Sequence, residues 1–276
     1  MTKHTANTNN NNLVTELTID CEKCSGLCCV ALYCTKTDGF PADKPSGEPC
    51  KNLMPDFRCA IHPQLSQKGM KGCLAYDCFG AGQKVTQHCY PNSTWQTNPA
   101  QAQEIFDTFL VVFQLHQMAW YLLDALSIVE DQSLKSTIEA LLAKNQQMTS
   151  QPPEKILHLD IESYKLEVNQ VLKKISEMIA NHSAERKQTK DFLGKNFKRA
   201  NLDGRDFIGA LLIAANLEGC SLRKTNFLAA DMRDTNIKNT DLSSSIFLTQ
   251  MQINSAKGNV NTKLPTNLSH PSTWLE

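Results

Sequence analysis

Cysteine is the residue type in this chain whose spacing most clearly indicates chemistry. Ten of its eleven cysteines lie between Cys21 and Cys89. Eight of them follow a metal-ligand pattern that opens as C-x2-C-x3-C-C: Cys21, Cys24, Cys28, Cys29, Cys50, Cys59, Cys73 and Cys78. Two thiolates separated by two residues converge readily on one tetrahedral ion, as in structural zinc sites, and thiolates also hold iron–sulfur clusters. The spacing therefore predicts a metal site and leaves zinc and an iron–sulfur cluster open.

Disulfides are the main alternative use of clustered cysteines. The N-terminus has no apolar segment typical of a secretory signal, and the cysteine total is odd, so both features favour reduced thiols in a cytoplasmic protein. Neighbouring Cys28 and Cys29 point in different directions, which favours two ions or a cluster over one mononuclear site. We expect Cys34 and Cys89 to be spare thiols, and His62 to be a less favoured candidate ligand.

The cysteine pattern also resembles a known family. The C-x2-C-x3-C-C run, the Cys59-Ala60-Ile61-His62 stretch and the Tyr76-Asp77-Cys78 stretch are similar to the cysteine-rich zinc- or iron-chelating domain family. The resemblance covers residues 20–80, with one extra residue before Cys28. It implies that the eight patterned cysteines bind metal, and it does not decide between zinc and iron–sulfur.

A second pattern, farther along the chain, has a period of five residues. Large apolar residues recur at every fifth position without a slip, at Phe192, Phe197, Leu202, Phe207, Leu212, Leu217, Leu222, Phe227, Met232, Ile237, Leu242 and Phe247. A helix drifts by about 100° per residue, so a five-residue step does not stay on one face. An odd step also alternates between the two faces of a strand. The period therefore predicts a chain that turns a corner at every pentad and stacks its coils.

The pentads resemble the pentapeptide-repeat family, with its A(D/N)LXX pattern. The best matches are Ala200-Asn201-Leu202-Asp203-Gly204 and Ala215-Asn216-Leu217-Glu218-Gly219. The resemblance implies a right-handed quadrilateral β-helix with four pentads per coil, hence three coils and neighbours 20 residues apart. Stacked sets would include Phe207, Phe227 and Phe247, the ladder Asn196, Asn216 and Asn236, and the charge series Lys198, Glu218 and Lys238. We expect Cys220 to fill the core.

The start of the repeat departs from this rule. Lys190, Lys195 and Arg205 occupy positions where the later pentads carry small residues. We therefore expect the first coil to be partial and to open toward the helical segment.

Between the two patterned segments, residues 99–185 have helical periodicity. A first helix starts at Asn98-Pro99, a second starts near Ser133 and ends before Gln151-Pro152-Pro153, and a third carries an apolar seam from Ile161 to Met178. The histidines of this block, His116, His158 and His182, are isolated in sequence, which favours surface or internally bonded roles over ligand roles.

These features define a multidomain fold class. We expect a small Cys-rich metal-stapled module, an α-helical bundle segment and a short right-handed quadrilateral β-helix. The predicted boundaries are a disordered tail over 1–19, the metal-binding module over 20–95, the helical segment over 96–186, the β-helix over 187–251 and a C-terminal tail or cap over 252–276.

Composition narrows the function. The 28 basic and 28 acidic side chains give a net charge of zero, which disfavours nucleic-acid binding and DNA mimicry, and no apolar run of 18 residues predicts a membrane span. Phosphate-binding, dinucleotide-binding, nucleophile-elbow and zinc-protease motifs are absent from the sequence. The outward residues Ile208, Leu228 and Leu248 predict a surface for a protein partner or self-association.

The favoured hypothesis is a metal-binding interaction or scaffold protein without evident catalysis. Two alternatives remain open. One is a zinc- or iron–sulfur-dependent modifying enzyme or redox sensor that uses the N-terminal cysteines. The other is a gyrase- or drug-protection factor.

Overall fold

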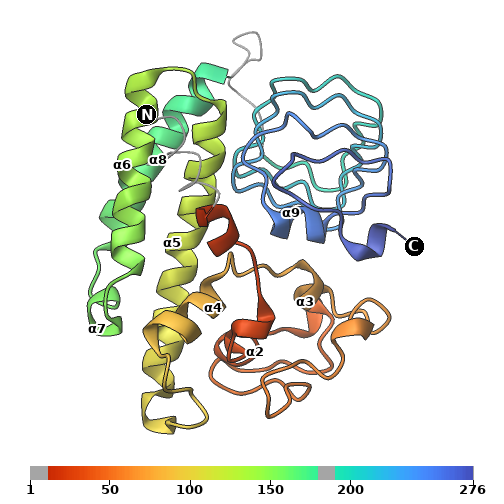
Figure 1. The fold of residues 1–276 in the computed structure, drawn as a ribbon. Helices are drawn as coiled ribbons and strands as arrows, with labels where there is room; N and C mark the ends of the chain where they lie inside the picture. Colours follow the sequence, from red (N-terminus) through yellow and green to blue (C-terminus); the bar gives the residue numbers. More distant parts are fainter. Residues whose placement is uncertain (1–11, 180–189, 276) are drawn as a thin grey trace. The chain divides into compact units, whose positions relative to one another are not determined.

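The chain is organised as two compact units. The structure, a computed structural model, describes residues 12–179 and 190–275 (Figure 1). The helical unit comprises Met1–Gly72 and Asp77–Leu172, and the repeat unit comprises Cys73–Tyr76 and Lys173–Glu276. The cysteine-rich segment and the predicted helices thus fall mainly in the helical unit, and the pentads fall in the repeat unit.

Helix α5 (Ala102–Ile128) is the centre of the helical unit. It follows the 3₁₀ turn η5 (Pro99–Gln101), as the Asn98-Pro99 signal predicts. Its apolar residues recur at three- and four-residue steps, and Phe109, Val112, Leu115 and Leu122 are fully buried. It packs against α6 (Gln132–Thr149), α7 (Pro153–Ile156) and the short helices of the cysteine-rich segment.

The other two long helices also follow the sequence signals. Asp131 caps α6 by accepting a hydrogen bond of 2.7 Å from the Leu134 amide, and α6 ends before the Pro152-Pro153 pair. Helix α8 (Ile161–Ile179) contacts α6 through Tyr164, whose hydroxyl donates to the Leu141 carbonyl at 3.0 Å. Met178, which we predicted in the α8 seam, is 57% exposed, so that part of the prediction is wrong.

His116 of α5 is a buried and bonded core histidine, one of the two positions that we expected for it. Its Nδ1 donates to the Phe79 carbonyl at 2.7 Å. Burial lowers its pKa to about 4, with Glu16 and Lys84 as the charged neighbours. His158 is exposed within the connection between α6 and α8, and His182 lies outside the described residues.

Short elements build the rest of the described chain. In the cysteine-rich segment they are η1 (Cys21–Lys23), α2 (Leu27–Ala31), η2 (Lys36–Asp38), η3 (His62–Gln64), α3 (Lys71–Ala75), α4 (Ala81–Lys84) and the π-helical turn η4 (Val85–Cys89). In the repeat unit they are α9 (Gln250–Ser255) and η6 (Ser272–Trp274).

The predicted quadrilateral β-helix requires a correction. The described residues contain no β-strand and no sheet, and the pentads pair only through isolated parallel bridges such as Asn196 with Asn216 and Asn216 with Asn236. The physical reason is that a turn in every pentad leaves a single bridging residue per side, too few for a strand ladder to propagate. The 20-residue register is nevertheless present in these bridges, and we call this segment the pentad coil.

The turn in each pentad depends on one backbone position. The residue two places after each apolar centre from Phe192 to Ile237 adopts positive φ, at values such as 67° for Gly204, 55° for Ala229 and 57° for Asn239. The Asn or Asp before the centre accepts the amide two residues on, as in Asn201 to Asp203 at 3.0 Å. Together, the left-handed residue and the side-chain turn bend the chain at every fifth residue.

Polar side chains inside the pentad coil bond to its backbone. The hydroxyls of Thr225, Thr235 and Thr240 donate to the carbonyls of Leu202, Leu212 and Leu217 at 2.9, 2.8 and 3.0 Å. Cys220 occupies the equivalent position, is 4% exposed and donates its thiol to Phe197 at 2.9 Å. The prediction that Cys220 fills the core is therefore confirmed.

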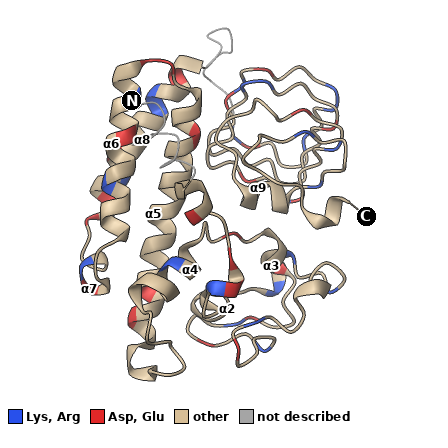
Figure 2. Cartoon of the chain, in the orientation of Figure 1, with Lys and Arg blue, Asp and Glu red and all other residues tan. Residues whose placement is uncertain are grey.

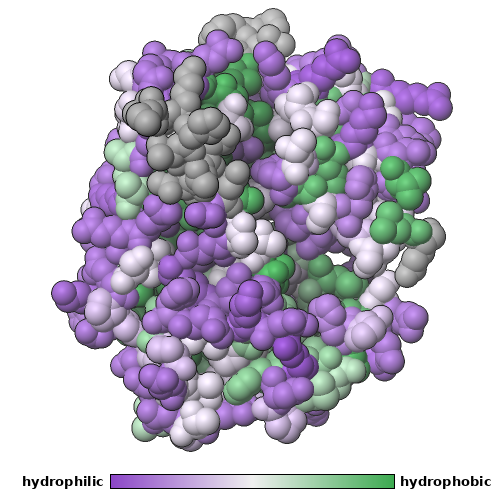
Figure 3. Space-filling view, viewed as in Figure 1, coloured by the Kyte–Doolittle hydropathy of each residue, from purple (hydrophilic) through white to green (hydrophobic). Residues whose placement is uncertain are grey.

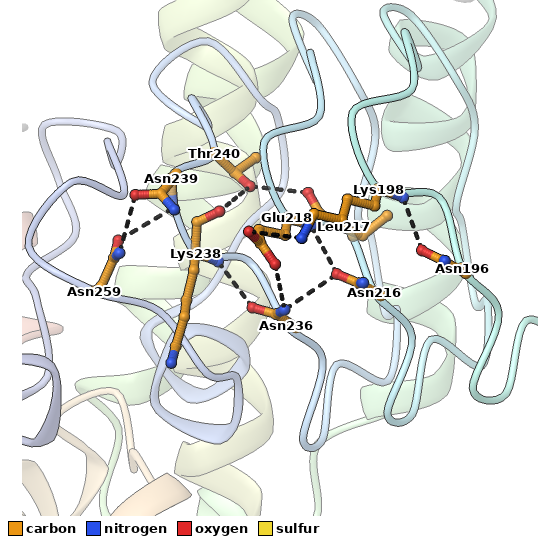
Figure 4. Close-up of polar contacts among 10 residues, drawn as sticks. All are labelled: Asn196, Lys198, Asn216, Leu217, Glu218, Asn236, Lys238, Asn239, Thr240 and Asn259. Carbon is orange, nitrogen blue, oxygen red and sulfur yellow. Dashed lines mark hydrogen bonds and ion pairs between the residues drawn. The ribbon is translucent and has the colours of Figure 1, made fainter.

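The outer ladder of the pentad coil also follows the predicted register. Figure 4 shows the Asn236 amide reaching Asn216 at 3.1 Å and Glu218 at 3.4 Å. Lys198 pairs with Glu218 at 3.1 Å, as expected for charges that alternate in sign. Inside, the rings of Phe207 and Phe227 stack with centroids 5.6 Å apart.

The first coil is complete, which corrects our expectation of a partial one. Its four sides bridge to the next coil, from Asp191–Leu211 to Asp206–Asn226. The Arg205 guanidinium lies 5.1–5.3 Å from the ring centroids of Phe192, Phe197 and Phe207. These cation–π contacts, worth about 0.5–2 kcal/mol each, let a large cation occupy the place of a small residue.

The C-terminal segment closes the other end of the pentad coil. After α9, Lys257 bridges to Asn236 and Lys263 bridges to Asp241. Trp274 is 6% exposed, and its ring fills the space where a Cβ on Gly258 would lie, at 2.5 Å. Residues 252–275 thus contribute to the core although their sequence lacks the five-residue period.

Residues Pro99–Ile128 form a helix long and apolar enough to cross a membrane by length and composition alone. Half of its apolar window is buried inside the molecule. The core helix of a water-soluble bundle meets the same two criteria, so this observation does not support a membrane span.

Replacing Ala229 by glycine should stabilise the pentad coil. Ala229 is exposed at φ 55°, a conformation that costs an L-residue about 1–2 kcal/mol, and the greater unfolded-state entropy of glycine returns part of that gain. We expect a net increase of up to about 1 kcal/mol in the free energy of unfolding, measured by calorimetry. Ala200→Gly, at negative φ, is the control and should destabilise; a loss of stability in Ala229→Gly would contradict the turn geometry.

His116 should make the helical unit less stable as pH falls. Its folded pKa of about 4 lies below the ordinary 6.5, so its contribution is present above pH 6.5 and is lost as pH falls toward 4. The linkage amounts to about 2 kcal/mol between pH 7 and pH 5. Urea unfolding followed by helical circular dichroism should show a smaller pH slope in His116→Gln and an unchanged slope in His158→Gln. Equal slopes in all three proteins would refute the buried neutral histidine.

Candidate metal centre

Helix α2 presents two neighbouring thiols at the centre of the cysteine-rich segment. The helix starts after Gly26, which has φ 69° and no room for a side chain because a Cβ would lie 2.9 Å from Leu53. The Sγ atoms of Cys28 and Cys29 are 3.9 Å apart. The hydrogen bond between the two sulfurs, together with burial, raises the pKa of Cys28, whereas the same bond lowers the pKa of Cys29 against the opposing effect of burial. Cys29 is therefore the member of the pair more readily ionised.

Glycine at position 82 lets two further sulfurs approach. A Cβ there would lie 2.6 Å from Cys24 Sγ and 3.8 Å from Cys78 Sγ. The amides of Gly26 and Leu27 donate to Cys24, and the amide of Gly82 donates to Cys78. Burial raises the pKa of both thiols, that of Cys78 to about 12. Amide donors stabilise thiolates. The space beside Gly82 therefore suits the ionised sulfurs of Cys24 and Cys78 once a cation balances their negative charge.

Cys21 lies at the exposed edge of the same group. Partial desolvation of its sulfur, followed by the charges of Cys24 and Cys29, raises its pKa to about 11. Two patterned cysteines, Cys24 and Cys29, thus lie near Cys21, together with the charged side chains of Asp20 and Arg58.

A second set of thiols is held beside α2 by backbone contacts. The Cys50 amide donates to the Cys29 carbonyl at 2.9 Å. Cys34 and Lys44 form an antiparallel bridge with bonds of 3.0 and 2.9 Å, and Lys44 Nζ donates to the Val30 carbonyl at 3.2 Å. Cys59 bridges through its backbone to Leu53. Cys50 is thus bonded directly to α2, and Cys34 is bridged to Lys44, which also bonds to α2.

The remaining candidates are placed elsewhere. Cys73 belongs to the short segment Cys73–Tyr76 of the repeat unit. His62 is exposed in η3. Cys89 lies in η4, where burial raises its pKa and Lys84 is its charged neighbour. Seven of the eight predicted ligands therefore share the helical unit.

All eleven cysteines are free thiols, so the expectation of reduced cysteines agrees with the structure. Within residues 12–179 and 190–275, no three His, Cys, Asp or Glu side chains are close enough to hold a metal ion as they stand. The thiols are of the type that binds zinc or iron as thiolates. Backbone amides donate to Cys24 and Cys78, and Gly82 leaves space beside these two sulfurs. Metal binding itself stays a prediction.

Sequence reasoning missed two contacts around these cysteines. Gly82 was interpreted only as part of a turn after Cys78, and Lys44 was not considered. The Gly80-Ala81-Gly82 run was a usable signal for close approach, because glycine lets another group come near the backbone. The contact of Lys44 with α2 depends on folding and had no local signal.

The predicted apolar stripe on the pentad coil is not a continuous open surface. Leu248 is 2% exposed and belongs to the core of the repeat unit. Ile208 and Leu228 are half-buried. The face of the molecule in Figure 3 is mostly hydrophilic, with apolar residues scattered among polar ones.

Comparison with known proteins identifies both the repeat and a full-length relative. Residues 210–247 match the model described as pentapeptide repeats, with eight copies. The match begins after the pentads in which Lys190, Lys195 and Arg205 replace small residues. The chain is 46% identical over 269 residues to "Uncharacterized protein YybG" of Bacillus subtilis (strain 168), covering 95% of this chain and 96% of the relative. The chain is thus a pentapeptide-repeat protein and belongs to the same family as YybG.

Proposed function

We propose that this protein is a metal-stapled interaction protein, in which thiolate-bound metal holds the cysteine-rich segment together and the pentad coil offers surfaces to a protein partner. The observation that carries the proposal is the collection of cysteines from separate stretches of chain around α2 and Gly82. Cys24 and Cys78, separated by more than fifty residues in sequence, meet at the gap that glycine 82 leaves open.

The middle of the cysteine-rich segment has few other means of cohesion. Helices α2 and α4 pack against α5, but no residue between positions 32 and 64 is buried. So loop-rich a stretch without an apolar core of its own is the kind that natural domains hold with disulfides or metals. Because all the thiols are free, bound metal is the remaining way to cross-link this segment.

The acid–base properties of the thiols agree with this role. Burial raises the pKa values of Cys24, Cys59 and Cys78, so ionising these groups without a cation is unfavourable. A bound divalent ion supplies the positive charge and makes the thiolates stable, which couples metal binding to folding. The same reduced thiols support a cytoplasmic location.

The pentad coil supplies regular, rigid surfaces suited to binding. Its side-chain ladders are fixed by bonds between coils, as at Asn216 and Asn236. Figure 2 shows basic and acidic residues interspersed along the coil, without a region of one sign. This mixed charge favours a protein partner over nucleic acid and weakens DNA mimicry as the basis of gyrase protection. Self-association through Ile208 and Leu228 remains part of the proposal.

Metal should copurify with the full chain isolated without oxygen. Elemental analysis and an absorption spectrum distinguish a colourless zinc protein from a brown protein with iron and sulfide. Cys24→Ser and Cys28→Ser should each lose metal and lower the unfolding temperature, because a ligand at a thousandfold its dissociation constant contributes about 4 kcal/mol.

Cys220→Ser is the matched control, since a serine hydroxyl can keep the bond to the Phe197 carbonyl. It should retain metal. If neither metal copurifies and the Cys24 and Cys28 variants are as stable as the wild type, the proposal of a metal staple is wrong. An iron–sulfur spectrum that changes reversibly with redox state would instead support the redox-sensor alternative.

A further inference from the structure

The first coil of the pentad coil ends in backbone groups that point away from the coils below it. In the second coil, the Asn216 amide donates to the Lys195 carbonyl at 2.9 Å, and the Asn216 carbonyl accepts the Phe197 amide at 2.8 Å. Both main-chain groups of a bridging residue therefore face the preceding coil. By the 20-residue register, the bridging residues of the first coil direct the same two groups outward, and we call three of them the open edge: Asn196, Asn201 and Asp206.

The open edge is exposed and unpaired. All three residues are exposed, and within residues 12–179 and 190–275 no group bonds to their main-chain amides or carbonyls. At the other end of the pentad coil, the Lys257 and Lys263 amides donate to the carbonyls of the third coil at 2.8 and 2.9 Å. One end is thus paired and the other is not, and an unpaired main-chain edge can pair with another extended chain.

The excess positive charge of the pentad coil belongs to its first coil. Residues 190–209 carry five basic and three acidic side chains, whereas residues 210–249 carry four of each. One of the three carboxylates, that of Asp203, is bonded to the second coil, where it accepts from the Ser221 hydroxyl at 2.6 Å and from the Arg223 amide at 2.8 Å. The first coil therefore has positive charge that its own carboxylates do not balance.

Three basic side chains lie at this end, and we call Lys190, Lys195 and Arg205 the end cations. Lys195 Nζ lies 5.6–5.7 Å from two ring centroids of the first coil, and the Arg205 guanidinium lies 5.1–5.3 Å from three. Lys190 Nζ lies beside Gly209, where a Cβ would be 3.8 Å away. These contacts are all with the first coil, so the cations extend over its end.

The end cations lack partners of opposite charge. No ion pair of the described residues includes any of the three. The Nε atom of Arg205 is buried and makes no hydrogen bond. A guanidinium usually pairs with a carboxylate or a phosphate where one is available, so this end of the coil favours an anionic group.

We propose that the open end of the pentad coil binds an extended segment of a protein partner that carries acidic side chains. The main chain of the segment pairs with the open edge, and its carboxylates meet the end cations. Addition of an extended peptide to an unpaired edge is a general mode of recognition. Because the coil turns a corner at every pentad, a straight segment pairs with one edge residue at a time, and the cations supply much of the affinity.

The same features disfavour two other occupants. A second copy of this chain would bring an identical set of end cations to the contact, and like charges facing each other across an interface are unfavourable. Nucleic acid has no regular series of N–H and C=O groups to pair with the open edge. The inference rests on the proposed function and adds to it the chemistry of the partner and the place where it binds.

Fluorescence anisotropy with a labelled eight-residue peptide of alternating Glu and Thr tests the proposal on the full chain. Alternate residues of an extended segment share a face, so the carboxylates can reach the cations together. The wild type should bind this peptide about tenfold more tightly than the matched Gln–Thr peptide. Lys190→Gln combined with Lys195→Gln should weaken binding about fivefold to tenfold, while Arg205 is left in place because its ring contacts support the first coil.

Lys238→Gln is the matched control, because it removes an exposed cation from the third coil; it should bind the peptide as the wild type does. The unfolding temperature checks that each variant is folded. A Glu–Thr peptide methylated at alternate main-chain nitrogens keeps its charges and loses half of its N–H donors, and it should bind more weakly than the unmodified peptide.

Four results would overturn the proposal: no binding of the Glu–Thr peptide, equal binding of the Gln–Thr peptide, equal loss in Lys238→Gln and in the double variant, or full affinity of the methylated peptide. A dimer in sedimentation that the double variant strengthens would show that a second copy occupies the end instead. If metal copurifies but the peptide does not bind, this inference fails while the metal staple stands. Absence of metal refutes the staple and leaves peptide binding to be judged by its own measurements.

Discussion

Both halves of this structure depend on one constraint, namely that a polar group removed from water must have a partner. The pentad coil meets it internally, since inward Thr235 and Thr240 hydroxyls donate to carbonyls of the neighbouring coil. Cys220 occupies the same kind of position and uses the same kind of bond. In the cysteine-rich segment, the amide donors at Cys24 and Cys78 meet only part of the requirement. Burial raises the pKa of both thiols, so they stay neutral and their desolvation cost is small unless a bound cation draws them into the thiolate form.

The five-residue period was sufficient to predict a stacked coil with a 20-residue register, because period and register are both properties of the sequence. The absence of strands was not foreseen, because the resemblance to the repeat family implied a β-helix. The number of extended residues on each side of a coil is set by the geometry of the turn. The turn itself depends on positive φ at positions occupied by Gly204 in one pentad and by Ala229 in another. The residue type at this position differs from pentad to pentad although the backbone conformation is the same. The sequence therefore contains no residue pattern that predicts the turn.

The helices were predictable for the opposite reason, because their signals are local. Pro99, the Asp131 cap and the Pro152-Pro153 pair mark ends that need no knowledge of the fold. Partners distant in sequence were not predictable. His116 bonds to Phe79, Cys24 approaches Gly82, and Cys34 bridges to Lys44. The cysteine spacing thus indicated the chemistry of the candidate site, but these contacts required the three-dimensional structure.

The two units also differ in what their stability depends on. The pentad coil is held by bonds between successive coils, by the cations over its first phenylalanines and by Trp274 at its far end, so its cohesion comes from the chain alone. The cysteine-rich segment has a small apolar core and no disulfide among its free thiols. The free energy of unfolding of the pentad coil is therefore expected to depend on its own packing and hydrogen bonds, and that of the cysteine-rich segment on the state of its thiols.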